Sequence, residues 1–255
     1  TALGAYVRAG GNLLVTLDPL VERDAFRATG LEAMLRGFGV AVDENIVIER
    51  DRSLLNAGGD DIFFVTTYGE HATTNVLRRL RPTTALRLAR SIRPVDVGSS
   101  AVRLLETSAE AYGETSIAER GGELPPAKNG ADLGGPLSLA VAVDTRARRA
   151  EPVGDEPPAP QQARTGGRMI VVGTSSWLMS AFIDRPEVAN FDLSSAWTGW
   201  LTQREALIAI APKRVQARAV VMAEGDLTSL AVRVLFLMPM AVLLLGIAVW
   251  WTRRQ

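Results

Sequence analysis

The feature that most constrains this chain is an apolar run near its C-terminal end, from Val234 to Trp251, that contains no charged side chain. As an α-helix this run would be about 27 Å long, close to the roughly 30 Å hydrocarbon core of a bilayer. Pro239 and Gly246 are unfavourable within soluble helices but are tolerated within membrane helices. We therefore predict a transmembrane helix over residues 230–252. The alternative is a buried core helix, and core helices rarely stay uncharged over such a length.

The side chains at the two ends of the run are those expected at membrane surfaces. Trp250 and Trp251 match the aromatic belt of a bilayer interface, and Arg253 and Arg254 follow at once. At the other end, Arg233 can extend its guanidinium group toward the lipid head groups. These residues, with Pro239, form the predicted membrane anchor, and membrane lipid is its predicted partner.

The charges that flank the run predict its orientation. The short tail is purely basic, whereas Ala223–Asp226 before the run is acidic. The positive-inside rule then places residues 253–255 in the cytoplasm and residues 1–229 outside it. A tail-anchored cytoplasmic protein with the opposite topology is the alternative.

The composition excludes several classes of function. The 28 Lys and Arg residues balance 28 Asp and Glu, which argues against nucleic acid as a partner because phosphate contacts need a basic excess. The chain has no Cys and a single His, His71, so thiolate chemistry and multi-histidine metal sites are excluded. It begins at Thr1 and passes directly into a helical pattern, so we expect it to be N-terminally incomplete.

Between its start and the apolar run, the chain reads as alternating strands and helices. Short, nearly continuous apolar segments between helices favour an α/β fold with a mostly parallel sheet covered by helices on both faces. Residues 137–213 either complete this sheet or form a small second unit, and we favour completion. Residues 144–168, rich in Arg and Pro, predict a mobile loop. The predicted strands are 12–17, 46–48, 62–65, 86–92, 102–105, 137–143 and 169–172, and the predicted helices are 2–8, 25–38 and 75–80.

The search for chemistry finds no strong motif. The sequence has no phosphate-binding P-loop, no dinucleotide fingerprint and no nucleophile elbow, so no catalytic residue, metal ligand or cofactor is predicted. Thr174 and Ser175 follow a strand, where ligands bind in doubly wound sheets, but such residues also cap helices. His71 is a candidate base, or else a loop or capping residue. Glu106 belongs to a row of glutamates spaced four positions apart. If this segment is helical, such a row is more typical of a solvated helix face than of a metal site.

Several stretches, in this order along most of the chain, resemble the gliding-motility G-type (GldG-like) auxiliary components of ABC-2-type transporters, a family that shares its domain with an intraflagellar transport protein. The order, rather than any single motif, carries the resemblance. The stretches are Ala5–Pro19, Tyr68–His71, Val102–Ser108, Gly135–Val143, Arg168–Ser175, Trp197–Leu201, Ile208–Lys213 and the final apolar run with its basic tail.

The resemblance implies a periplasmic domain with a flavodoxin-like or amidotransferase-like core and no known catalytic residues. It also implies an auxiliary role in the bacterial inner membrane, beside an ABC-2-type permease and a separate ATPase, in gliding or in export. The sequence departs from the family where Ala72-Thr73 follow His71 and where Thr174 follows Gly173. A ligand at either position is therefore in doubt.

Two functions remain open. The first is a non-catalytic, membrane-anchored auxiliary subunit of an ABC transporter, which acts in complex assembly or substrate engagement. The second is a membrane-anchored hydrolase or carbohydrate-binding protein on the same core, which would use His71, Glu106 or Ser175. The second predicts that these side chains converge in one pocket.

Overall fold

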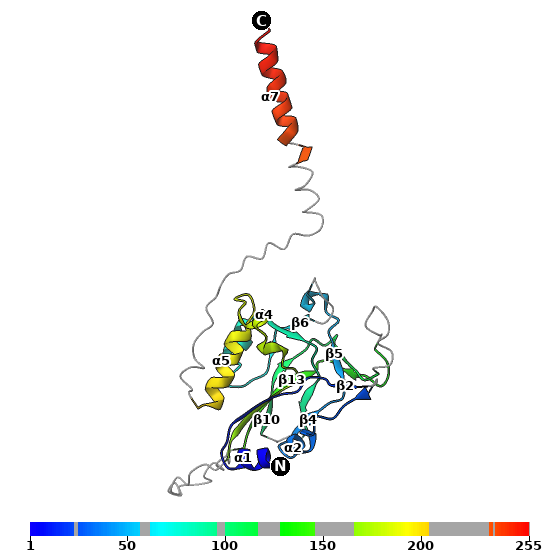
Figure 1. The fold of residues 1–255 in the computed structure, drawn as a ribbon, viewed down its shortest axis with the longest axis vertical. Coiled ribbons are helices and arrows are strands. Elements are labelled where there is room, and N and C mark those ends of the chain that lie inside the picture. The colour runs from blue at the N-terminus through cyan, green and yellow to red at the C-terminus, as the bar shows by residue number, and fades with distance from the viewer. Residues whose placement is uncertain are drawn as a thin grey trace, which may run out of the picture. The chain divides into compact units, whose positions relative to one another are not determined.

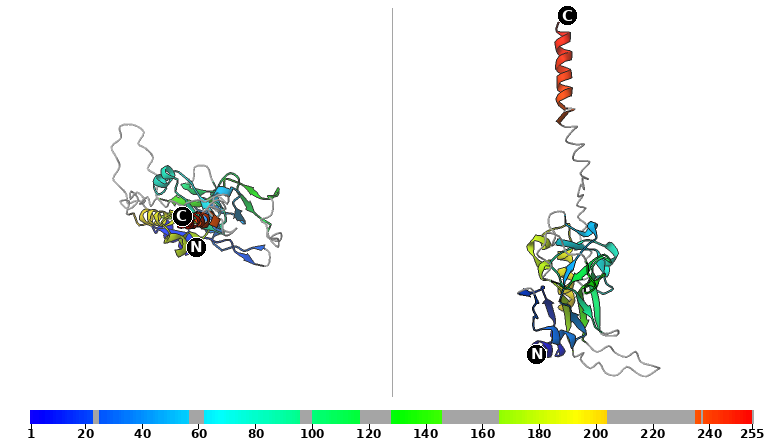
Figure 2. Two further views of the ribbon diagram at one scale, coloured as in Figure 1. Left: turned by 90° about the horizontal axis from the view of Figure 1, so that it is seen from above. Right: turned by 90° about the vertical axis from the view of Figure 1, so that its right-hand side faces the viewer.

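The computed structural model describes residues 1–22, 25–56, 62–95, 100–116, 128–145, 166–203, 235–236 and 238–254. The chain divides into two compact units, Thr1–Val215 and Gln216–Gln255. Figures 1 and 2 show the elements of both.

The first unit is built around a five-stranded mixed sheet. Its strands lie in the order β1-β14-β13-β10-β7. β1 and β14 pair in parallel, whereas the pairs β14–β13, β13–β10 and β10–β7 are antiparallel. The strands are β1 (Leu13–Thr16), β7 (Thr67–Tyr68), β10 (Ala101–Glu106), β13 (Ser138–Asp144) and β14 (Arg168–Val172).

This sheet differs from the mostly parallel sheet that the sequence suggested. The apolar runs were read as parallel strands because strands buried on both faces lack alternation. β13 and β14 are buried on both faces, yet they pair antiparallel with each other. Burial of both faces therefore arises here from the helices that cover the sheet, whatever the direction of its strands. The flavodoxin-like or amidotransferase-like class stays a prediction.

Successive residues of the central strands supply two separate cores. Ile170 and Val172 belong to one core, and Met169 and Val171 belong to the other, as expected from the period of two in a strand. The first core also holds side chains from η3 and α5, including Trp177 and Trp197. The second holds side chains from α1 and α2.

Helices therefore cover both faces of the sheet. α1 lies at one end of this unit and α4 toward the other in Figure 1. α5 is the longest helix described in this unit, and its buried Leu193, Trp197 and Trp200 pack on the first core. The helices are α1 (Ala2–Arg8), α2 (Glu32–Arg36), η1 (Arg52–Leu54), α3 (Asn75–Leu80), η3 (Ser176–Leu178), α4 (Ser180–Ile183) and α5 (Asn190–Leu201).

Shorter strands form four smaller sheets, β2–β3, β4–β9, β6–β8 and β12–β11–β5. All of their pairings are antiparallel. They comprise β2 (Val21–Glu22), β3 (Ala25–Phe26), β4 (Val40–Val42), β5 (Ile46–Ile48), β6 (Ile62–Val65), β8 (Thr84–Arg87), β9 (Ile92–Pro94), β11 (Tyr112–Glu114) and β12 (Leu133–Gly134).

Two predicted elements are wrong. The helix expected over 25–38 is reduced to α2, because Gly30 adopts a left-handed φ of 83° and the Glu32 carboxylate accepts the Thr29 and Gly30 backbone N–H groups. The strand expected over 86–92 is divided into β8 and β9, and Leu88 between them has a φ of 44°.

Several other predictions fall partly outside the described residues. Of the predicted loop 144–168, residues 146–165 are not described, and neither are residues 204–234, which include Arg233.

The second unit contains α7 (Met238–Thr252), which carries no charged residue. Within the part of the chain that the structure describes, no helix combines the length and apolar character needed to cross a membrane.

Candidate functional site

Of the sequence-predicted site residues, Thr174, Ser175 and His71 lie near the two ends of β14, whereas Glu106 ends β10. Thr174 and Ser175 follow its last residue, next to the carboxyl end of the parallel strand β1. Arg168 is the first residue of the strand, and the side chains of Arg168 and His71 both contact the Trp200 ring. Each end is described separately below.

At the carboxyl end, the Asp18 carboxylate binds the turn that follows β14. Asp18 Oδ1 accepts the backbone N–H of Ser175 at 2.7 Å, and Asp18 Oδ2 accepts the Ser175 hydroxyl at 2.7 Å. Asp18 Oδ1 also lies 3.2 Å from Thr174 Oγ1. A strand end with an exposed backbone N–H is a frequent anion site, and in this chain its own carboxylate occupies that position.

The hydroxyls beyond this turn join it to β8. Thr174 Oγ1 donates to the Arg87 carbonyl at 3.0 Å and accepts the Ser176 N–H at 3.1 Å. The Ser176 hydroxyl in turn accepts the Arg87 N–H at 2.8 Å. The side chains of this turn therefore attach the end of β14 to β8. Ser175 precedes η3 but makes no side-chain cap bond to it.

At the other end of β14, His71 packs against the C-terminal end of α5. Its ring meets the Trp200 ring edge-on, with 4.9 Å between centroids, and its Nδ1 lies 2.9 Å from the Thr73 hydroxyl. The Arg168 guanidinium stacks over Trp200 at 4.7 Å and donates through Nη1 to the Trp200 carbonyl at 2.6 Å. Asp144 lies 3.5 Å from Arg168 Nε.

This environment keeps His71 uncharged near neutral pH. Burial, together with the positive charge of Arg168, lowers the pKa of His71 from 6.5 to about 4, and only Asp144 opposes the shift. A general base working near neutrality would need a pKa closer to the ambient pH and a proton-donating partner within reach. His71 instead contacts Thr73 and Trp200, so it acts as a packing residue.

His71, Glu106 and Ser175 do not converge. Arg168, beside His71, and Val172, before Ser175, are four strand steps apart, or about 13 Å at roughly 3.3 Å a step. Glu106 ends β10, which is separated from β14 by β13, and its carboxylate faces Arg103 at 3.7 Å. Glu106, Glu110 and Glu114 are not on one helix either, because they belong to β10, a turn and β11. The catalytic constellation required by the hydrolase hypothesis is therefore not formed.

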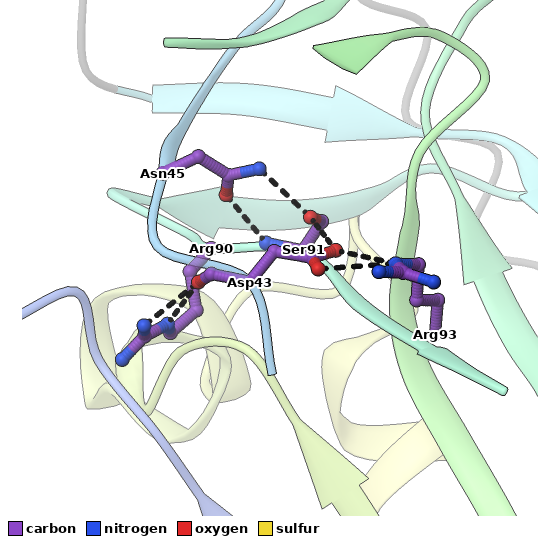
Figure 3. A network of polar contacts seen from close by, with 5 residues as sticks. All are labelled: Asp43, Asn45, Arg90, Ser91 and Arg93. Carbon is purple, nitrogen blue, oxygen red and sulfur yellow. Dashed lines mark hydrogen bonds and ion pairs between the residues drawn. The ribbon is translucent and has the colours of Figure 1, made fainter. Parts of the chain in front are cut away.

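A third polar cluster, shown in Figure 3, was not foreseen from the sequence. Arg90 Nε and Nη2 both donate to the Asp43 carbonyl, at 2.9 and 2.7 Å. Asn45 accepts the Ser91 N–H at 3.0 Å, and the Ser91 hydroxyl donates to the Asp43 carboxylate at 2.7 Å. Arg93 Nε completes an ion pair with the same carboxylate at 3.0 Å.

This cluster holds the β4–β5 connection against the segment that leads into β9. Arg90 is only 1% exposed, and burial lowers its pKa. Its Nη1 has no hydrogen-bond partner among the described residues. A charged residue within the apolar run 86–92 was the available signal, but its partner is 47 positions away and could not be identified locally.

Metal ligation finds no support in the described ranges, where no group of three or more His, Cys, Asp or Glu side chains could hold an ion. The residues gathered at all three clusters bind each other.

Comparison with known proteins relates the chain to a family model and to solved structures. The model of the family ABC_transp_aux, described as "ABC-type uncharacterized transport system", matches residues 1–199. The chain is also similar to a solved structure of the mmIFT52 N-terminal domain, with a TM-score of 0.50 and 14% identity over 78% of this chain and 68% of that one. At this identity the second match concerns the fold alone. Among curated proteins no significant match was found.

Proposed function

Because the chain belongs to the ABC-type uncharacterized transport system family, we propose that it is a non-catalytic auxiliary subunit that assembles with an ABC-2-type permease and a separate ATPase. The family match over residues 1–199 is the observation that carries this proposal. It confirms the expected relation to auxiliary components of ABC transporters. The narrower gliding-motility G-type assignment remains part of the proposal, and so does a role in gliding or export.

The chemistry of the first unit supports a non-catalytic role. Ser175 is engaged by Asp18, and the low pKa of His71 leaves it neutral against Trp200. These 255 residues contain no phosphate-binding loop, in keeping with a separate ATPase subunit as the proposed source of energy. A subunit of this kind contributes a folded surface to the complex.

We further propose that residues 230–252 anchor the protein in the bacterial inner membrane, with the first unit in the periplasm and the C-terminal tail in the cytoplasm. The support is the uncharged run Val234–Trp251 in the sequence, together with the exposure of large apolar side chains along α7. Exposed apolar surface of this extent marks contact with lipid or with another protein. The basic pair Arg253 and Arg254 supports the orientation.

Affinity purification of the full protein from gently solubilised membranes tests the proposed function. We expect a permease and an ATPase to co-purify at a fixed ratio. A variant that ends at Val215 retains the first unit and lacks the second, so it is the matched control for anchoring and should leave the membrane fraction.

The two parts of the proposal can fail separately. Recovery of the full protein alone and monodisperse would contradict the transporter role. Retention of the truncated variant in washed membranes of cells that lack the permease would contradict anchoring by the C-terminal segment, because the remaining unit would then carry its own membrane contact.

A further inference from the structure

The surface of α7 is apolar on every side. Leu243, Leu244 and Leu245 are consecutive, so they point in directions about 100° apart, and they are 62%, 60% and 66% exposed. A helix that docks in a protein groove presents one apolar stripe and keeps polar residues on the opposite face. α7 has no such polar face, so a continuous apolar medium such as lipid suits it better than a groove.

The C-terminal end of α7 has a different chemistry. The Arg254 guanidinium stacks over the Trp250 ring, 4.4 Å from its centroid. Trp250 and Trp251 are 57% and 66% exposed. Tryptophan rings favour the head-group level of a bilayer, and a guanidinium held against one is placed at that same level.

No acidic side chain lies near the two arginines of this end in the sequence. From Val234 to the last residue the sequence contains no Asp or Glu. Within the described ranges, no ion pair involves Arg253 or Arg254. A guanidinium donates five N–H bonds in a planar fork that suits phosphate oxygens, so two adjacent guanidinium groups favour an anionic partner at the head-group level.

We propose that Trp250, Trp251, Arg253 and Arg254 form a binding site for the phosphate head groups of anionic phospholipids. This inference rests on the proposed membrane anchoring and adds to it a choice of lipid. An anionic bilayer supplies both an apolar medium and anionic oxygens, whereas an acidic protein segment would supply only anionic oxygens.

Fluorescence of the full protein, reconstituted in vesicles of equal parts phosphatidylglycerol and phosphatidylcholine, tests the lipid choice. Trp177, Trp197 and Trp200 are buried, so quenchers on lipid chains report on Trp250 and Trp251. In one sample only the phosphatidylglycerol carries brominated chains, and in the other only the phosphatidylcholine does. The lipid composition is otherwise the same. An anionic surface favours each nearby arginine by about 1 kcal/mol, or about fivefold, so we expect brominated phosphatidylglycerol to quench more strongly.

Two double variants separate a local effect from one of net charge. Arg253→Gln/Arg254→Gln should make the two brominated lipids equally effective. Arg78→Gln/Arg79→Gln removes the same charge from exposed positions on α3 and should keep the preference of the native protein.

Each outcome has one meaning. Equal quenching by the two lipids in the native protein would overturn the inference while leaving the anchoring intact. An absence of quenching by both would contradict the anchoring itself. A preference that persists in the Arg253→Gln/Arg254→Gln variant would show that the anionic lipid is held elsewhere.

Discussion

His71 is the residue whose charge most clearly depends on the fold. Its pKa is lowered to about 4 in the folded unit, first by burial and then by Arg168, whereas it is about 6.5 in an unfolded chain. Between pH 6.5 and 4 the unfolded chain binds a proton on His71 that the folded unit does not bind. The free energy of unfolding therefore decreases as the pH falls from 6.5 toward 4.

We therefore expect the free energy of unfolding of the native protein to fall more steeply between pH 6.5 and 4.5 than that of His71→Asn. The asparagine side chain retains an acceptor for Thr73 but cannot be protonated. Urea titrations of both proteins at several pH values measure the difference. Parallel pH profiles would mean that the imidazole is already protonated in the fold or free of its burial penalty.

At Gly173, beside the turn that the Asp18 carboxylate binds, the backbone closely approaches the backbone of Arg90. A Cβ atom there would lie 1.9 Å from the Arg90 carbonyl oxygen, and Arg90 N–H donates to the Gly173 carbonyl at 2.8 Å. Gly173→Ala should therefore lower the free energy of unfolding by about 1–3 kcal/mol through overpacking. Gly130→Ala, where nothing lies within 4 Å, is the control and should change it by less than about 0.5 kcal/mol. Equal stability of the two variants would refute the close approach.

At the scale of elements, α5 is attached to β8 through Asn190. Its Oδ1 accepts the Ala85 N–H, and its Nδ2 donates to the Ala85 and Trp177 carbonyls, all at 2.9 Å. Asn190→Ala leaves these buried backbone groups unpaired, so we expect a loss of about 3 kcal/mol. Asn75→Ala, an exposed position at the start of α3, should cost less than about 0.5 kcal/mol.

Hydrogen exchange provides a second measurement for the same pair of variants. The Ala85 amide should exchange faster in Asn190→Ala and at the native rate in Asn75→Ala. Unchanged protection of Ala85 in both would mean that β8 is held without Asn190.

Elements with strong local patterns could be predicted from the sequence. α1 and α3 begin and end where they were expected, and β5 and β6 match their predicted ranges. The prediction of a helix over 25–38 is wrong because β3 pairs with β2 and because the Glu32 carboxylate binds backbone N–H groups that precede α2. Apolar spacing alone does not reveal either interaction.

The candidate site was less predictable, because its partners are distant in sequence. Thr174 and Ser175 were identified from their place after a strand, but their partner Asp18 lies 157 positions from Ser175. The parallel pairing of β1 with β14 brings them together. The Arg90–Asp43 contact depends in the same way on pairing between β4 and β9.

At the scale of the whole molecule, the first unit contains both cores described here. All members of these two cores lie between Val7 and Leu201. Removal of residues 216–255 should therefore leave the urea midpoint of the first unit unchanged within error. A lowered midpoint in the truncated protein would mean that the second unit contributes to the stability of the first.

The pairing of β1 with β14 also has a consequence for how the chain is made. Leu13 is opposite Met169, so the partner of β1 is translated 156 residues after it. At roughly 5–20 residues per second, this interval is about 8–30 s. During that time the Leu13–Val15 segment leaves the ribosome without the neighbour that covers it in the finished sheet. We therefore expect β1 to stay without its parallel partner until translation passes Val172.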